Sequence, residues 1–138
     1  MKSSSHLDVA QRRDAKQQQM LDAAAQIARE QGVHAITVGE VAKRAGIARS
    51  TVYDYFNSGS DIVADVLVDE LTDMAGSIAK RVHPTASPQE AVQQWIRAML
   101  EYITDGRHRL VRDAAAADLP PTRKAQLGEL HRELMTPL

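Results

Sequence analysis

The amino-acid sequence contains no cysteine and no long apolar run. The lack of cysteine excludes disulfide bridges, thiolate metal sites and cysteine nucleophiles. No apolar segment approaches the roughly 20 residues that a membrane-spanning helix needs, and the N-terminus lacks the apolar core of a secretory signal peptide. The default expectation is therefore a cytoplasmic chain that has no membrane partner.

The residues that are abundant favour a helical globular domain. Alanine occupies 21 of the 138 positions, and aromatic residues make up only 4%. Alanine is the strongest helix former and a weak strand former. A hydrophobic content of 43% and a charged content of 25% are ordinary for a folded domain. The composition thus excludes a wholly disordered chain.

Charge is distributed unevenly along the chain. The net charge is −1, but residues 1–60 hold eight Lys or Arg against six Asp or Glu, whereas residues 61–138 hold nine against twelve. The first part is net positive and the second is net negative. The first part is therefore the better candidate for an anionic partner.

Hydrophobic spacing and helix-end signals predict an all-α chain of about seven helices. The first helix is expected over about Arg12 to Gln31, after frayed N-terminal residues, and Gly32 is its stop. Two short helices are expected over 38–45 and 49–56, joined by a tight turn at Gly46. Two short helices with such a turn form a helix-turn-helix.

The second half of the chain carries its own helix starts. Ser58, Ser87 and Thr122 stand where their side chains can cap helices. The segment from Ser87 to Glu90 is the strongest start, because it combines a capping serine, a proline at the first helical position and a glutamate at the third. A further helical segment is expected over about residues 107–118.

A series of motifs runs through the first part of the chain. It comprises an Ala-Ala pair in the first helix, Gly32, Thr37-Val38, Val41-Ala42, Ala45-Gly46-Ile47, Thr51-Val52-Tyr53 and Tyr55-Phe56. In this order and at this spacing, about residues 13–62 resemble the N-terminal domain of the TetR family of bacterial transcriptional regulators. The resemblance is specific, because the motifs of the recognition helix and those of the helix before it occur together at the spacing that the family shows.

The resemblance implies a DNA-binding transcriptional regulator. Residues 1–60 would be a three-helix DNA-binding domain with its helix-turn-helix at about 37–56. Residues 61–138 would be a helical regulatory and dimerisation domain, expected to be incomplete because the chain is shorter than is usual for the family. Such a regulator would act as a repressor in the bacterial cytoplasm. Its homodimer would bind a palindromic operator in double-stranded DNA, and an unknown small-molecule effector would release it.

The expected DNA contacts follow from the helix-turn-helix. The second helix of this motif places its N-terminal residues at base edges in the major groove. Arg49 is the residue there that can make a bidentate contact with a base, and free N–H groups at the start of the preceding helix favour a phosphate. The resemblance adds two tyrosines as phosphate contacts. The full set is Thr37, Val38, Arg44, Ala48, Arg49, Ser50, Thr51, Tyr53 and Tyr55.

By the same resemblance, an effector would bind inside the C-terminal helical domain. The residues expected to face inward and to contact it are Trp95, Met99, Tyr102 and Ile103. The alternative is that this stripe is plain hydrophobic core. Trp95 and Tyr102 are the better ligand candidates, because each has a polar group that needs a partner when buried.

No pattern in the sequence indicates an enzyme, a cofactor or a metal site. The five histidines are scattered, and Glu129, His131 and Glu133 diverge around a helix, so they cannot share a metal ion. The chain has neither a Ser-centred nucleophile elbow nor a glycine-rich phosphate loop. We therefore expect a protein that acts by binding.

A second hypothesis is a helical protein-interaction module with a weakened or silent DNA-binding face. Three residues that depart from the family pattern support it. Ala48 provides no capping side chain for the recognition helix, and Asp54 adds an acid beside it. Gly59 stands where the family usually has a lysine that reaches the DNA backbone. Loss of all salt-dependent DNA binding would favour this hypothesis.

Overall fold

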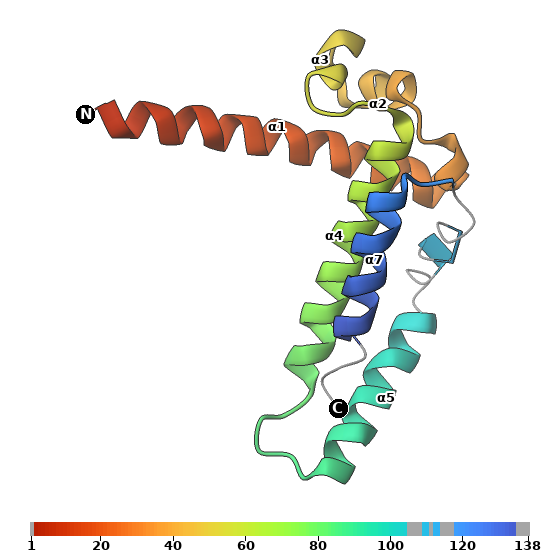
Figure 1. The fold of residues 1–138 in the computed structure, drawn as a ribbon. Helices are drawn as coiled ribbons and strands as arrows, with labels where there is room; N and C mark the ends of the chain where they lie inside the picture. The colour runs from red at the N-terminus through yellow and green to blue at the C-terminus, as the bar shows by residue number, and fades with distance from the viewer. Residues whose placement is uncertain (1, 105–108, 111, 114–117, 135–138) are drawn as a thin grey trace. The chain divides into compact units, whose positions relative to one another are not determined.

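The computed structural model describes residues 2–104, 109–110, 112–113 and 118–134. In this part of the chain every regular element is a helix, which confirms the all-α prediction. Figure 1 shows them in chain order: α1 (Lys2–Gln31), the short 3-10 helix η1 (Val33–Ala35), α2 (Val38–Ala45), α3 (Arg49–Tyr53), α4 (Gly59–Arg81), α5 (Pro88–Thr104) and α7 (Pro121–Leu134). The helix predicted over 107–118 lies largely outside the described residues. No described helix is long and apolar enough to cross a membrane.

The chain divides into two compact units, Met1–Val63 and Ala64–Leu138. In the first unit, α1 packs against α2, and α2 packs against α3. The buried stripe of α1 has the predicted helical spacing and consists of Met20, Ala24, Ile27 and Ala28, each at most 6% exposed. Val41 of α2 and Val52 of α3 are fully buried as well. The helix-turn-helix is thus fixed by a small aliphatic core.

Helix α1 begins earlier than the sequence predicts. It starts at Lys2, whereas a start near Arg12 is expected. The segment from Lys2 to Gln31 contains neither glycine nor proline, so no residue in it stops the helix. Ala, Gln, Lys and Arg, which recur in it, lose little free energy in a helical backbone.

Two glycines end helices of the first unit as predicted. Gly32 follows α1 with a φ of 96°, and Gly46 follows α2 with a φ of 70°. An L-residue with a side chain rarely adopts such a conformation. The N–H of Ile47 then donates to the carbonyl of Ala42 at 3.0 Å, which closes the end of α2. The tight turn that brings α3 to α2 therefore depends on Gly46.

Helix α3 is shorter than predicted. It ends at Tyr53, although the sequence indicates a helix to residue 56. The reason is a tightening of the last turn, in which the N–H groups of Asp54 and Tyr55 donate to carbonyls three residues back, at 3.1 and 3.0 Å. Phe56 follows this turn and is 2% exposed. Its burial anchors the end of α3 in the core.

The helices of the second half begin at the predicted signals, with one shift. The Ser58 hydroxyl accepts from the Asp61 N–H at 3.2 Å at the start of α4. At α5, the Ser87 hydroxyl accepts from the Glu90 N–H at 3.3 Å, and the Glu90 carboxylate accepts from the Ser87 N–H at 2.9 Å. This is a complete capping box. Helix α7 begins at Pro121, so Thr122 lies in its first turn and does not precede it.

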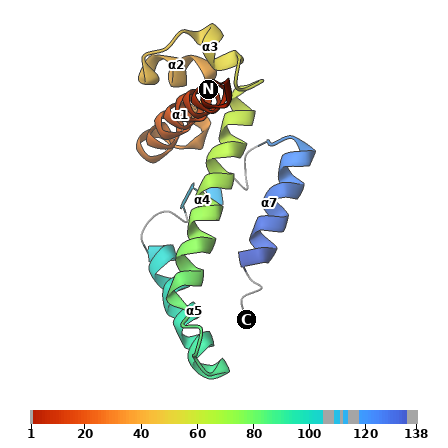
Figure 2. The same cartoon turned by 90° about the vertical axis from the view of Figure 1, so that its left-hand side faces the viewer.

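The second unit packs α5 and α7 against α4. Figure 1 and Figure 2 both show α7 beside α4, and Arg123 of α7 forms an ion pair with Asp65 of α4. The buried cluster of this unit combines residues from three helices, namely Leu71, Met74, Ile78, Ala98, Tyr102 and Leu134. Apolar contact between helices is therefore the main stabilising term.

The glycine in the interior of α4 offers a test of helix propensity. An ideal Cβ on Gly76 would meet no heavy atom within 4 Å, so Gly76→Ala should stabilise the chain by about 0.5–1 kcal/mol. Gly59→Ala is the control, because a Cβ there would lie 3.1 Å from the Ile36 carbonyl oxygen. Urea unfolding followed by circular dichroism should show a gain for Gly76→Ala and a smaller gain or a loss for Gly59→Ala. Equal gains would contradict this packing.

The capping box of α5 predicts a pH dependence. The backbone N–H of Ser87, and after it the Ser87 hydroxyl, hold the pKa of Glu90 below its ordinary value. Because the folded pKa is the lower one, the stabilisation is present above the unfolded pKa and is lost as the pH falls through the folded pKa. Glu90→Gln should therefore lower Tm at neutral pH and lower it progressively less in acid. The control is Glu129→Gln on α7, and an equal pH profile for both variants would refute the prediction.

Candidate nucleic-acid interface

The N-terminal end of α3 presents polar side chains to solvent. Arg49 and Ser50 are exposed and Thr51 is half-buried, while Val52 is fully buried on the opposite side of the helix. Ala48 precedes the helix in an extended conformation and makes no side-chain cap. Burial of Val52 therefore fixes which face of α3 points outward. That outward face carries the predicted base-reading residues.

Arg49 lies beside the start of α2. An ideal Cβ on Gly39 would lie 3.8 Å from the guanidinium carbon of Arg49, so no side chain separates this arginine from the first turn of α2. The Thr37 hydroxyl caps that turn by accepting from the Glu40 N–H at 3.1 Å. The N-terminal end of a helix carries a partial positive charge and unpaired N–H groups. The arrangement thus combines a cation with a helix N-terminus, which suits a phosphate or a base edge.

All nine predicted DNA-contacting residues lie in the first unit, but their side chains differ in exposure and in pairing. The Val38 side chain is only 5% exposed, so its backbone alone is available to a ligand. Arg44 forms an ion pair with Glu30 of α1 at 2.6 Å, which partly neutralises its charge. Tyr53 is 51% exposed, whereas Tyr55 is half-buried. Of the two predicted arginines, Arg49 is therefore the better candidate to bind an anionic ligand.

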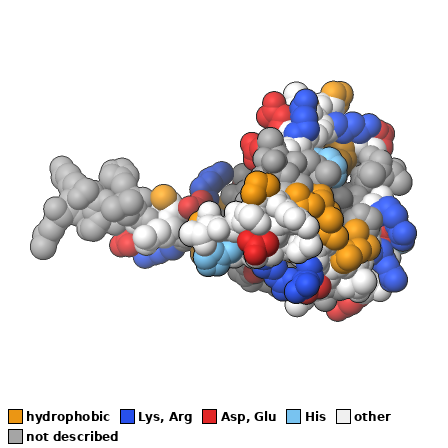
Figure 3. Space-filling view, turned by 90° about the horizontal axis from the view of Figure 1, so that it is seen from below, with side chains coloured by type: hydrophobic (Ala, Val, Ile, Leu, Met, Phe, Trp, Pro, Cys, Tyr) orange, Lys and Arg blue, Asp and Glu red, His pale blue; other side chains and the backbone are white. Residues whose placement is uncertain are grey.

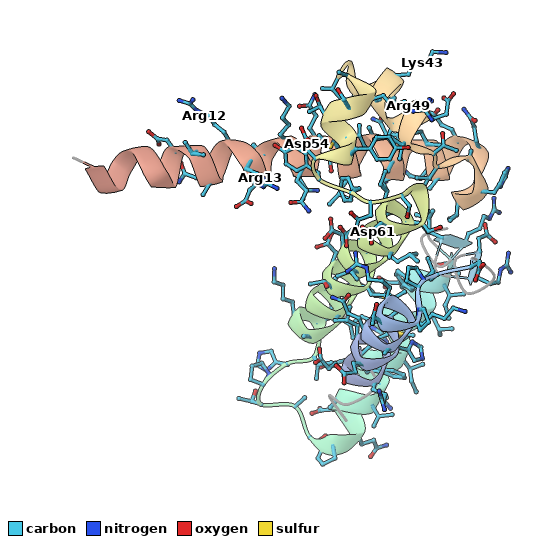
Figure 4. All side chains as sticks on the ribbon, turned by 45° about the horizontal axis from the view of Figure 1, so that its top comes forward. Arg12, Arg13, Lys43, Arg49, Asp54 and Asp61 are labelled. Carbon is cyan, nitrogen blue, oxygen red and sulfur yellow. The ribbon has the colours of Figure 1, made fainter. Side chains whose placement is uncertain are left out.

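Sequence reasoning missed a contact between α1 and the end of α3. The guanidinium carbon of Arg13 lies 4.9 Å from the ring centroid of Tyr55. A nitrogen of the same group donates to the Asp54 carbonyl oxygen at 3.5 Å, across 41 residues of sequence. Figure 4 labels Arg12 and Arg13 on α1 and Asp54 beyond α3. No periodicity or motif links positions so far apart, so the sequence offers no signal for this pairing.

The predicted ligand contacts of the second unit divide into three settings. Tyr102 lines a cavity of about 460 Å³ between α4 and α5, whose wall also includes Ile78 and the Arg81–Glu101 ion pair. Trp95 and Met99 pack against the buried cluster but do not line this cavity. The indole N–H of Trp95 is buried, and no described residue forms a hydrogen bond with it. Only Tyr102 of the four predicted residues thus contributes to the wall.

The prediction that Ile103 faces inward is wrong. Its side chain is 47% exposed and follows Ile96 and Leu100 at helical spacing along the outer face of α5. Tyr102, one residue earlier, is turned about 100° away around the helix and faces inward. The apolar stripe read from the sequence therefore covers two faces of α5. No group of three or more metal-ligating side chains gathers among the residues that the structure describes.

Comparison with known proteins agrees with this geometry. Residues 20–66 match the model of the bacterial regulatory proteins of the tetR family. The activator FasR of Mycolicibacterium smegmatis, an HTH-type transcriptional regulator, is 24% identical over 91 residues, which cover 66% of this chain and 42% of that protein. This chain spans less than half the length of the curated relatives it matches.

Solved structures show the same fold over a longer part of the chain. A TetR-family regulator from Marinobacter aquaeolei has a TM-score of 0.72 at 19% identity, covering 91% of this chain and 68% of that one. The regulator FadR of Bacillus subtilis, solved in complex with stearoyl-CoA, has a TM-score of 0.65 at 21% identity, covering 84% of this chain and 63% of its own. Both likenesses extend well beyond the helix-turn-helix.

The first unit is therefore a helix-turn-helix domain. The motifs of α2 and α3, the turn at Gly46 and the family match over residues 20–66 agree on this class. Over residues 20–66 this unit is similar to the tetR family of bacterial regulatory proteins, in agreement with the resemblance found in the sequence.

The cap of α2 gives a direct test of this local structure. Thr37→Val keeps the shape of the side chain but removes the hydroxyl that accepts from the Glu40 N–H, and loss of such a cap costs about 1 kcal/mol. Thr72→Val is the control, since Thr72 is exposed in the middle of α4. Thermal unfolding should show a lower Tm for Thr37→Val than for Thr72→Val. The same Tm for both would show that the cap does not stabilise α2.

Proposed function

We propose that this chain is a DNA-binding transcriptional regulator that places α3 in the major groove. The observation that carries the proposal is the position of Arg49, exposed on α3 and adjacent to the N-terminal turn of α2. Arg49 would contact a guanine edge, and the Ser50 and Thr51 hydroxyls would lie close to the same groove. The α2 N-terminus and the two tyrosines would hold phosphates, which set the register on the duplex.

The proposal extends to a homodimer on a palindromic operator. A helix-turn-helix reads only a few base pairs, so specific binding uses two half-sites about one helical turn, roughly 34 Å, or a multiple of it apart. Two copies related by a two-fold axis would meet such an operator. The protein would act in the bacterial cytoplasm, by binding and without catalysis.

The proposal also includes a repressor that a small molecule releases from DNA. The cavity of about 460 Å³ between α4 and α5 falls within the size range of small-molecule sites. A structural neighbour, FadR of Bacillus subtilis, was solved with stearoyl-CoA, which supports a small-molecule effector for a protein of this fold. For release, the effector must bind one conformation of the protein more tightly than the DNA-binding one.

One observation favours the alternative, a helical protein-interaction module. The outer face of α5 exposes a row of large apolar side chains, Val92, Ile96, Leu100 and Ile103, each at least 40% exposed. Figure 3 shows hydrophobic side chains in a band on one face, bordered by charged groups. Apolar surface that gathers in this way is typical of a contact with another protein. A measurement of DNA binding distinguishes the two functions, because the regulator binds duplex DNA in a salt-dependent way and the interaction module does not.

Charge reversal at Arg49 tests the proposed function. Arg49→Glu should weaken binding to duplex DNA by about tenfold or more, because it removes the base contact and adds repulsion from phosphates. Fluorescence anisotropy over a salt series with genomic fragments measures this, and circular dichroism checks that the fold is retained.

The matched control is Arg97→Glu on α5, which changes the net charge by the same amount at another exposed arginine. Its affinity for DNA should stay near that of the wild-type chain. An equal loss for both variants would reduce the effect to net charge, and unchanged binding by Arg49→Glu would remove Arg49 from the interface.

A further inference from the structure

The contact of Arg13 with the end of α3 differs from an ordinary surface contact. Its guanidinium lies 4.9 Å from the ring centroid of Tyr55, within the range of a cation–π interaction. The hydrogen bond to the Asp54 carbonyl is long, at 3.5 Å, so the stacking on the ring is the stronger part of the contact. Arg13 thus joins α1 to the two residues that directly follow α3.

The two groups that Arg13 contacts lie where the orientation of α3 is set. Asp54 is the C-cap of α3, and its N–H donates to the Thr51 and Val52 carbonyls. Carbonyls at the end of a helix carry partial negative charge, which a cation stabilises. Tyr55 lies between this cap and the buried Phe56. Holding the Tyr55 ring therefore restrains the segment that connects α3 to the core.

We propose that Arg13 is a positioning residue for the recognition helix, acting by stacking on Tyr55 and not by binding phosphate itself. The inference rests on the proposed function, because it concerns how α3 is oriented for binding to DNA. A flat guanidinium covers an aromatic face, whereas an ammonium group interacts as a point charge. The shape of Arg13, and not its charge alone, is what fixes the ring.

Arg12 provides a matched control on the same helix. It has the same charge, lies one residue away and is exposed, and among the described residues no aromatic ring stacks on its guanidinium. Figure 4 shows both arginines on α1. Arg12→Ala therefore removes one positive charge from α1 and leaves the stacked contact intact. Any effect of the charge itself should appear equally in Arg12→Ala and Arg13→Ala.

The experiment uses the full chain and the duplex that the wild type enriches from a random-sequence pool, beside a scrambled duplex. Arg13→Ala should lower the ratio of the two affinities by about two- to five-fold, the worth of an exposed cation–π contact. Arg13→Lys should not restore the ratio, and Arg12→Ala should leave it unchanged. The slope of affinity against salt should stay the same in Arg13→Ala as in Arg12→Ala.

Other outcomes overturn the inference. A salt slope that falls by about one in Arg13→Ala but not in Arg12→Ala would make Arg13 a direct phosphate contact. Rescue by Arg13→Lys, or equal effects of Arg12→Ala and Arg13→Ala, would reduce its role to charge. If the wild type enriches no duplex, the proposed function fails and the inference fails with it.

A measurement without DNA separates these failures. Amide hydrogen exchange in the free protein should become faster at Val52 to Phe56 in Arg13→Ala and should not change there in Arg12→Ala. Unchanged exchange in Arg13→Ala, in a chain that does bind DNA, would refute the positioning role alone and leave the proposed function standing.

Discussion

The burial of Val52 and Phe56 is the constraint on which the orientation of α3 depends. Both side chains are at most 2% exposed, and they lie at either side of the tight turn that ends α3. A helix of five residues has little stability of its own. Its orientation must come from its attachment to α1 and α2. Because these two side chains are fixed in the core, the side chains of Arg49 and Ser50 on the opposite side of α3 point into solvent.

The start of α4 adds a second restraint on the same unit. An ideal Cβ on Gly59 would lie 3.1 Å from the Ile36 carbonyl oxygen and 3.5 Å from the Thr37 Cα. The first turn of α4 therefore approaches the backbone just before α2. The close approach gives a physical reason for glycine at this position, where the family usually has a lysine. A side chain at this position would require the backbone at Ile36 to shift.

The sequence was sufficient for the features that depend on local chemistry. Ser87 and Glu90 predicted the start of α5, and Gly32 and Gly46 predicted two helix ends, because caps and left-handed turns need particular residues at particular positions. Periodicity predicted the buried stripe of α1. The base-reading role of Arg49 remains a prediction, since it depends on DNA that the chain alone does not contain.

Features set by tertiary contact were not predictable in the same way. The stacking of Arg13 on Tyr55 joins two positions with no common pattern. The exposed side of α5 reads as core because Ile103 and Tyr102 belong to one apolar stretch, and only the packing of α4 and α7 decides which face is covered. The early start of α1 shows a related limit, since polar residues predict fraying while their helix propensity permits a regular helix.

The proposed function requires that the first unit bind DNA through α3 and the start of α2. A titration of the isotope-labelled chain with duplex DNA, followed by the amide resonances, tests it directly. We expect shifts confined to residues 37–39 and 49–55. Shifts centred on α5 at residues 88–104, or none at any DNA concentration, would contradict it.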